Sequence, residues 1–170
     1  MESEIVNKVA KSSLITIDLE ELYDSGDRIL YDLKNNLYEE SILKERDFRA
    51  FLKDHDWSEY ADKNVAIYCS ADAIVPIWAY MLLAVKMEPF AKTIVYGDLN
   101  QLNEFLWNKA LIKIAPTDYV DKKVVIKGCS KIKVPTSVYV EVTRLLRPVA
   151  ASIMYGEPCS TVPLYKAPRK

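Results

Sequence analysis

From residue 63 onward, apolar and polar positions follow a pattern that predicts strands alternating with helices. Short apolar runs typical of buried strands occupy residues 64–69, 93–99, 123–129 and 152–159. Apolar segments of helical length and spacing lie between them, at residues 76–87, 102–111 and 135–146. Strands that alternate with helices pair in parallel, because each crossover helix returns the chain to the same end of the sheet. The pattern therefore predicts an α/β protein.

The first sixty residues have a less regular pattern. Residues 1–11 place Ile5, Val6 and Val9 at near-helical spacing, which predicts a short amphipathic helix. Strands are predicted at 14–17 and 28–33, on either side of turn residues 24–27, and a one-sided helix at 44–55. We expect a single domain over residues 1–170, in which residues 1–60 form an N-terminal α+β extension packed on the main sheet.

Residues 63–98 and 123–157 contain two similar sequences. Near the start of each segment the matches are sixty residues apart: Lys63, Cys69 and Ser70 recur as Lys123, Cys129 and Ser130. After one deletion the offset is 59, and Pro76, Tyr80 and Gly97 recur as Pro135, Tyr139 and Gly156. These matches predict a duplicated β-α-β unit. We expect the two units to form one doubly wound parallel sheet with its strands in the order 2-1-3-4.

Each of the three cysteines is followed by a serine, giving the pairs Cys69-Ser70, Cys129-Ser130 and Cys159-Ser160. The predicted order places the first strands of the two units side by side, and ligands of such sheets bind beyond the carboxyl ends of the strands there. Three thiolates that converge at this place could hold zinc or an iron–sulfur cluster. The fourth ligand would be Asp72, Asp98, Glu157 or water. The predicted metal ligands are therefore Cys69, Cys129 and Cys159.

Other functions fit the same loops. Backbone N–H groups and hydroxyls before a helix bind anions, so the loops could form a pocket for an anion or small ligand without metal. The residues of such a pocket would be Ser70, Ser130, Ser160, Asp98 and Glu157. A redox-active or nucleophilic thiol, cysteines that only pack in the core, and an interaction protein without a site are further alternatives. No catalytic residue is predicted, and His55, the only histidine, is expected at the surface or in a turn.

Composition excludes several classes of function. The chain has 23 basic and 24 acidic residues among 170, a balance that provides no positive surface for nucleic acid or an anionic membrane. The longest apolar stretch, residues 73–85, contains Pro76 and is too short to span a bilayer. Only four glycines occur, without the glycine-rich motifs that bind nucleotides. We expect a cytoplasmic protein.

The segments CSADAIVPIWAYML, VVIKGCSKIKVPTSVYVE and GEPCSTVPLYK, together with HDWSEYADKNVAIYCS, resemble a bacterial family catalogued as a domain of unknown function, number 2480. The resemblance covers nearly the whole chain. No activity is assigned to the family, so no catalytic residue carries over. The resemblance implies genes that lie near iron–sulfur assembly genes, and so iron–sulfur assembly proteins as partners and an accessory role in cluster assembly. A homodimer is an alternative form of association.

Overall fold

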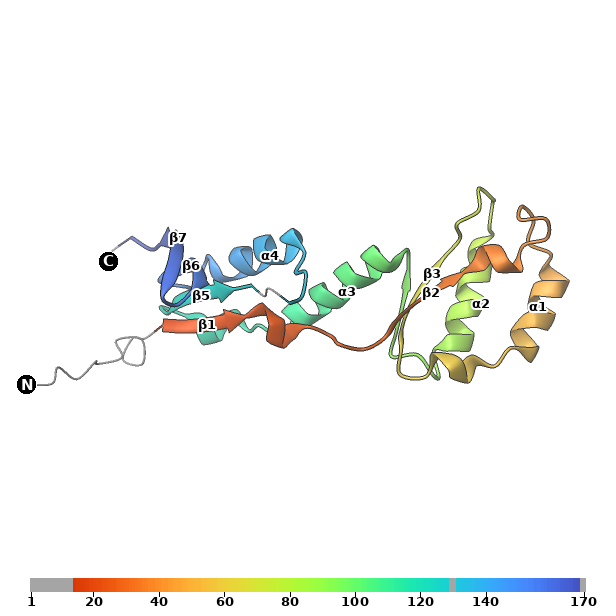
Figure 1. Ribbon diagram of the computed structural model, residues 1–170, viewed down its shortest axis with the longest axis horizontal. Helices are drawn as coiled ribbons and strands as arrows, with labels where there is room; N and C mark the ends of the chain where they lie inside the picture. Colours follow the sequence, from red (N-terminus) through yellow and green to blue (C-terminus); the bar gives the residue numbers. More distant parts are fainter. Residues whose placement is uncertain (1–13, 129–130, 169–170) are drawn as a thin grey trace, which may run out of the picture. The chain divides into compact units, whose positions relative to one another are not determined.

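The computed structural model describes residues 14–128 and 131–168. The chain divides into two compact units (Figure 1). Unit 1 contains the residues up to 24 and those from 107 onward, and unit 2 contains residues 25–106. Each unit has its own sheet, so the described chain is an α/β protein with two mostly parallel sheets.

The sheet of unit 2 consists of three parallel strands in the order β2-β3-β4. Their bounds are β2 (Arg28–Asp32), β3 (Asn64–Tyr68) and β4 (Thr93–Tyr96). Two short 3-10 helices flank them, η2 (Leu33–Asn36) after β2 and η3 (Trp57–Tyr60) before β3. The central strand is buried over residues 64–67, which is typical of a parallel strand covered on both faces.

Helices cover both faces of this sheet. Side chains of α1 (Glu45–Asp54) and α2 (Ile77–Met87) pack with Val65 and Ile67 on one face. On the other face, Ala66 contacts the first turns of α3 (Leu99–Leu111). Because successive residues of a strand point to opposite faces, the alternation along β3 explains how a short strand serves two layers.

The sheet of unit 1 has four strands in the order β1-β5-β6-β7. Their bounds are β1 (Leu14–Asp18), β5 (Lys123–Lys127), β6 (Ser152–Glu157) and β7 (Ser160–Lys166). The first three are parallel, whereas β7 returns from β6 as an antiparallel edge strand. Pro163 lies within β7, a position tolerated because an edge strand leaves one row of N–H groups unpaired. The core contains Trp107 and Leu111 of α3 and the buried face of α4 (Thr136–Leu146).

Corresponding elements of the two units are 59 residues apart. The offset relates η3 to η4 (Pro116–Tyr119), β3 to β5, and α2 to α4. Two pairs of backbone positions with positive φ also match, Asp62 with Asp121 and Gly97 with Gly156. The strand bounds therefore align Cys69 with Gly128 rather than with Cys129. The offset of sixty expected around the cysteines is one residue too large.

The strands and helices predicted from residue 63 onward are present, as are the predicted strands near 14–17 and 28–33 and the helix at 44–55. The single doubly wound sheet is wrong. The strands of the expected N-terminal extension are integral to the two sheets: β1 pairs with β5, and β2 pairs with β3. The neighbours of β3 are β2 and β4, while those of β5 are β1 and β6, so the first strands of the two units are not paired. The predicted helix at 1–11 lies outside the described residues.

Candidate functional site

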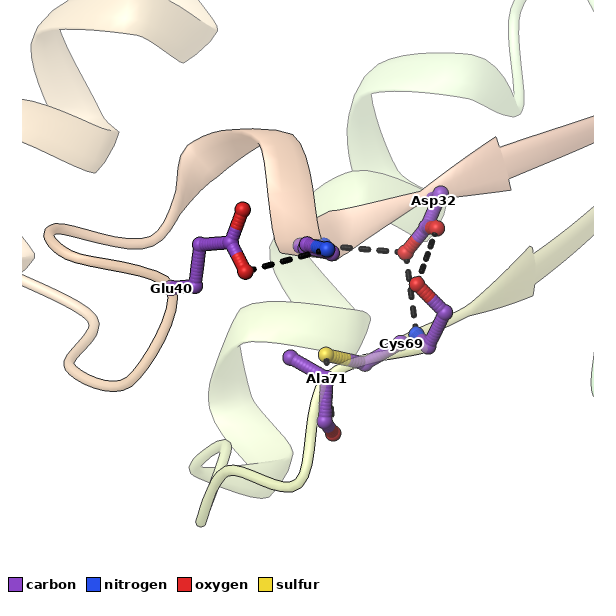
Figure 2. Close-up of polar contacts among 6 residues, drawn as sticks. Asp32, Glu40, Cys69 and Ala71 are labelled. Atoms are coloured by element: carbon purple, nitrogen blue, oxygen red, sulfur yellow. Dashed lines mark hydrogen bonds and ion pairs between the residues drawn. The ribbon is translucent and has the colours of Figure 1, made fainter.

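The carboxylate of Asp32 joins the ends of two neighbouring strands of unit 2. It accepts hydrogen bonds from the backbone N–H of Lys34 at 3.0 Å, from the N–H of Ser70 at 3.0 Å and from the Ser70 hydroxyl at 2.6 Å (Figure 2). The bond from Lys34 caps η2 after β2, and the two from Ser70 hold the loop that follows β3. Burial raises the pKa of Asp32, but the bonds from Ser70 and Lys34 together lower it below its usual range. The carboxylate is therefore ionised at neutral pH.

Cys69 lies at the start of the loop that Asp32 holds. Its half-buried thiol is 3.9 Å from the carbonyl oxygen of Ala71 (Figure 2). Tyr80 of α2 lies near the thiol, and its ring meets that of Tyr96 edge to face at 5.2 Å between centroids. Burial raises the pKa of Tyr80, and the nearby Cys69 raises it further. The surroundings of Cys69 are thus those of a half-buried thiol packed beside aromatic rings.

A cavity of about 290 Å³ lies beside edge strand β2 in the same unit. Its lining combines polar and aromatic side chains from β2, η2, α1 and η3, together with the residue that follows α1. The lining residues are Leu30, Tyr31, Asp32, Asn35, Asn36, Phe51, His55 and Tyr60. Side chains from four elements therefore meet at one space, next to the carboxyl end of a parallel strand.

Aromatic packing fixes His55 at the wall of this cavity. The residue follows α1, and its ring centroid lies 4.6 Å from that of Trp57 and 4.9 Å from that of Phe51. On its polar side, His55 Nε2 lies 2.8 Å from Glu59 Oε1. Burial raises the pKa of Tyr60, and a hydrogen bond with Glu59 raises it further, so the hydroxyl stays protonated. The imidazole of His55, the phenol of Tyr60 and the carboxylate of Glu59 thus lie close together beside the cavity.

A second polar pair, Tyr31 and Asn36, also lines the cavity. The Tyr31 hydroxyl donates to Asn36 Oδ1 at 2.6 Å, which leaves the amide N–H₂ group of Asn36 able to donate elsewhere. Burial raises the pKa of Tyr31 well above its usual range, so this phenol is also protonated. The cavity therefore offers both hydrogen-bond donors and hydrogen-bond acceptors. They belong to ring and amide side chains that are held in place by contacts with neighbouring residues.

Unit 1 has a row of charges at the carboxyl ends of its strands. Lys127 Nζ lies 3.4 Å from Asp18 Oδ2 and 3.5 Å from Glu157 Oε1. Glu157, and then Asp18, raise the pKa of Lys127. Asp18 also caps η1 (Leu19–Leu22) by accepting from the N–H of Glu20 at 2.9 Å. The charged groups of this row are therefore paired with one another.

Beside this row is a cavity of about 260 Å³ with a mainly apolar lining. The lining residues are Ile126, Thr136, Tyr139, Thr143, Tyr155 and Leu164. The rings of Tyr139 and Tyr155 meet edge to face at 5.7 Å between centroids. The Tyr139 hydroxyl covers Gly128 so closely that a Cβ there would lie 2.2 Å from the oxygen. The cavity therefore has little polar chemistry with which to orient a ligand.

The residues predicted to bind a metal or ligand are divided between the units. In unit 2, Ser70 is bound by Asp32, and Asp98 caps α3 by accepting from the N–H groups of Asn100 and Gln101 at 2.8 and 3.0 Å. In unit 1, Glu157 pairs with Lys127, and exposed Cys159 lies in the turn before Ser160, the first residue of β7. Cys129 and Ser130 lie outside the described residues. Asp72, a predicted fourth ligand, is exposed in the loop after Ser70.

Across residues 14–128 and 131–168, no three or more His, Cys, Asp or Glu side chains gather as a metal site would require. The cavity beside β2 was missed by the sequence analysis, which expected His55 at the surface or in a turn. The available indication was the aromatic residues around it, in FLKDHDWSEY at residues 51–60. A lone histidine has no spacing motif, so only the folded chain brings it beside Asn35 and Asn36.

Comparison with known proteins identifies the family. The family model described as "Protein of unknown function (DUF2480)" matches residues 3–167, so the chain belongs to this family, as the resemblance had indicated. No curated protein and no solved structure matches the chain. Within the described residues, no helix has the length and apolar character needed to cross a membrane.

Proposed function

We propose that this DUF2480 protein is a ligand-binding module, and that the cavity beside β2 in unit 2 holds a small polar molecule. The observation that carries the proposal is the convergence of Asp32, Asn35, Asn36 and His55 on one space of about 290 Å³. Concave sites with a few convergent polar groups and perturbed titratable groups are the usual places of ligand binding. The proposal keeps the small-ligand alternative of the sequence analysis and moves it away from the cysteines.

The cavity's chemistry limits the ligand. At about 290 Å³ it is close to the lower limit of small-molecule sites, which fits a one-ring molecule. Asp32 and the nearby Glu59 bring negative charge, whereas Lys34, the basic residue beside Asp32, pairs with Glu40 at 3.0 Å. Phe51 and Tyr60 offer aromatic surface. We therefore propose a neutral or cationic ring that carries N–H or O–H donors, rather than an anion.

The chain's single histidine provides a direct test. Ligand-observed NMR would use benzamidine, nicotinamide and benzoate as cationic, neutral and anionic one-ring probes, and the His55 ring protons would report where they bind. Benzamidine or nicotinamide should bind and shift the His55 signals, and Asn36→Leu should abolish the shift because it removes an amide from the cavity.

Lys53→Ala is the matched control, since Lys53 is exposed on α1 and does not line the cavity. It should leave binding unchanged. Circular dichroism should show that both variants keep the fold. The proposal fails if none of the probes binds at millimolar concentration, if benzoate binds best, or if binding survives Asn36→Leu.

An iron–sulfur cluster or zinc held by Cys69, Cys129 and Cys159 stays a prediction from the sequence, as does partnership with iron–sulfur assembly proteins. No contact among the described residues favours it, and Cys129 lies outside them. Metal analysis of protein purified anaerobically without a chelator tests it. If the wild-type protein binds zinc or iron and Cys159→Ser does not, the predicted metal site is supported. If the wild-type protein contains no metal, the prediction is wrong.

We also propose that the two units derive from one duplicated unit. The support is the constant offset of 59 residues, which relates β3 to β5, α2 to α4, and Gly97 to Gly156. An experimental structure in which residues 64–96 and 123–155 do not superpose would contradict the duplication.

A further inference from the structure

Helix α2 is apolar on both of its faces. Its inner face contributes Ala79, Leu83 and Met87 to the core of unit 2. Its outer face carries a stripe of side chains that are far from buried: Ile77 is 77% exposed, Met81 63% and Val85 67%. Ile74, in the loop before the helix, is 95% exposed. A helix that is apolar all round is normally buried all round, so the outer stripe indicates an interaction surface.

Helix α4 of unit 1 shows that the fold does not require this stripe. Its inner face matches that of α2, with Val138, Val142 and Leu146 buried at positions 59 residues later. Its outer face is mostly polar. The counterparts of Ile74, Ile77, Met81 and Val85 are Lys133, Thr136, Val140 and Arg144.

Polar contacts complete the outer face of α4. Arg144 donates from Nε to Glu141 at 2.8 Å, and Val140 is the one large apolar residue among the four counterparts. Two helices of equal length in similar units thus differ on the face that their own sheets do not contact. The outer apolar residues of α2 are therefore not needed to build the unit.

We propose that the outer stripe of α2, residues Ile74, Ile77, Met81 and Val85, is the interface between two copies of this chain. The stripe carries no charge, so it has no means of selecting a partner by electrostatic complementarity. Residues 77, 81 and 85 form one i, i+4 row, and such a row packs into the groove beside an identical row on a second helix. A two-fold axis uses the same surface on both copies, which this arrangement satisfies.

The size of the stripe fits such a dimer. Four large side chains at these exposures present on the order of 500 Å² per copy, or about 1,000 Å² for two copies, which reaches the lower bound for a specific interface. Met81 is central, four residues from both Ile77 and Val85. Near a two-fold axis a residue contacts its own copy, so Met81 should face Met81 of the second copy.

Sedimentation velocity of the full chain between 1 and 200 µM tests the proposal. The wild-type protein should sediment as a dimer of the 19.5 kDa chain. Met81→Glu should raise the dissociation constant by about 100-fold or more, because two like charges would be buried together. Val140→Glu is the matched control at the same helical position of α4, where the side chain is 65% exposed, and it should leave the dimer intact.

Charge pairing makes the test specific for the two-fold arrangement. Met81→Lys should also be monomeric, and an equimolar mixture of Met81→Glu and Met81→Lys should dimerise again. Circular dichroism should show unchanged secondary structure in all three variants, since both positions are exposed. A wild-type monomer at 200 µM, a Met81→Glu dimer, equal dissociation by Val140→Glu, or a monomer that associates only with a different protein would each overturn the proposal.

Discussion

The two hydrogen bonds that Ser70 donates to Asp32 should contribute measurably to the stability of unit 2. Asp32→Ala removes an N-cap and two hydrogen bonds that link the end of β2 to the loop after β3. Loss of an N-cap costs about 1 kcal/mol. Bonds to a charged acceptor contribute about 1.5 kcal/mol or more each, but solvent weakens them at a carboxylate that is only partly buried. We expect a loss of about 2 kcal/mol in the free energy of unfolding.

Urea unfolding followed by tryptophan fluorescence measures this loss, because Trp57 and Trp78 both lie in unit 2. Asp56→Ala is the matched control. Asp56 accepts the same pair of bonds, from the N–H and hydroxyl of Ser58 at 3.0 and 2.6 Å, but only within its own turn. It should destabilise the unit clearly less than Asp32→Ala does. If Asp32→Ala and Asp56→Ala lowered the free energy of unfolding equally, the view that Asp32 stabilises the unit by joining two strands would be refuted.

Three further predictions concern pH and packing. The pKa of Asp32 is lower in the folded chain than in the unfolded chain, where it is about 3.9. The ionised carboxylate therefore stabilises the fold fully above about pH 3.9, and this stabilisation is lost as the pH falls through the lower folded pKa. Urea titrations of wild type and Asp32→Asn should give the same free energy of unfolding below that folded pKa. Leu33→Ala should destabilise unit 2 by about 3 kcal/mol in the same assay, because Leu33 is fully buried in its core, and a loss below 1 kcal/mol would contradict that packing. Gly156→Ala should cost about 1–3 kcal/mol, since φ is 122° and the new Cβ would lie 2.6 Å from the Ser160 carbonyl oxygen. Thermal unfolding followed by circular dichroism should show a lower Tm, and an unchanged Tm would argue against this backbone geometry.

The strands and helices could be predicted because their causes are local. The periodicity of apolar residues decides whether a segment forms a helix or a strand, and Pro89 and Pro148 follow the ends of α2 and α4 as stop signals do. Edge strand β7 was not predicted, because Pro163 interrupts its apolar pattern. Local sequence was thus sufficient for the elements that follow a regular pattern.

The pairing of strands could not be predicted in the same way. Strands β1 and β2 are both apolar enough to pair with either β3 or β5. Nothing in the sequence of β1 or β2 indicates which of these partners each strand takes. Cys69 and Cys129 were matched by residue identity, whereas the strands align Cys69 with Gly128. The strands β3 and β5, which precede the two cysteines, belong to different sheets, so the expected meeting of thiols depended on a strand pairing that sequence identity does not determine.

The cavity beside β2 could not be predicted from the sequence either, for a different reason. Asn35 and Asn36 belong to the 3-10 helix η2 after β2, and His55 follows α1 nearly twenty positions later. Neither segment has a spacing motif, and each would be expected as ordinary surface. The outer stripe of α2, in contrast, could have been noticed from the sequence IWAYMLLAVKM, whose one charged residue is Lys86.

The pairing of β1 with β5 has a consequence for how the chain acquires its structure during synthesis. Leu14 pairs with Lys123, and the whole of unit 2 lies between them in the sequence. Unit 2 is continuous, so its three strands are complete before β5 has left the ribosome. Closing such a long loop is entropically costly, and contacts between distant residues form late. The N-terminal strand therefore waits for β5 while unit 2 folds, and the sheet of unit 1 is completed after that of unit 2.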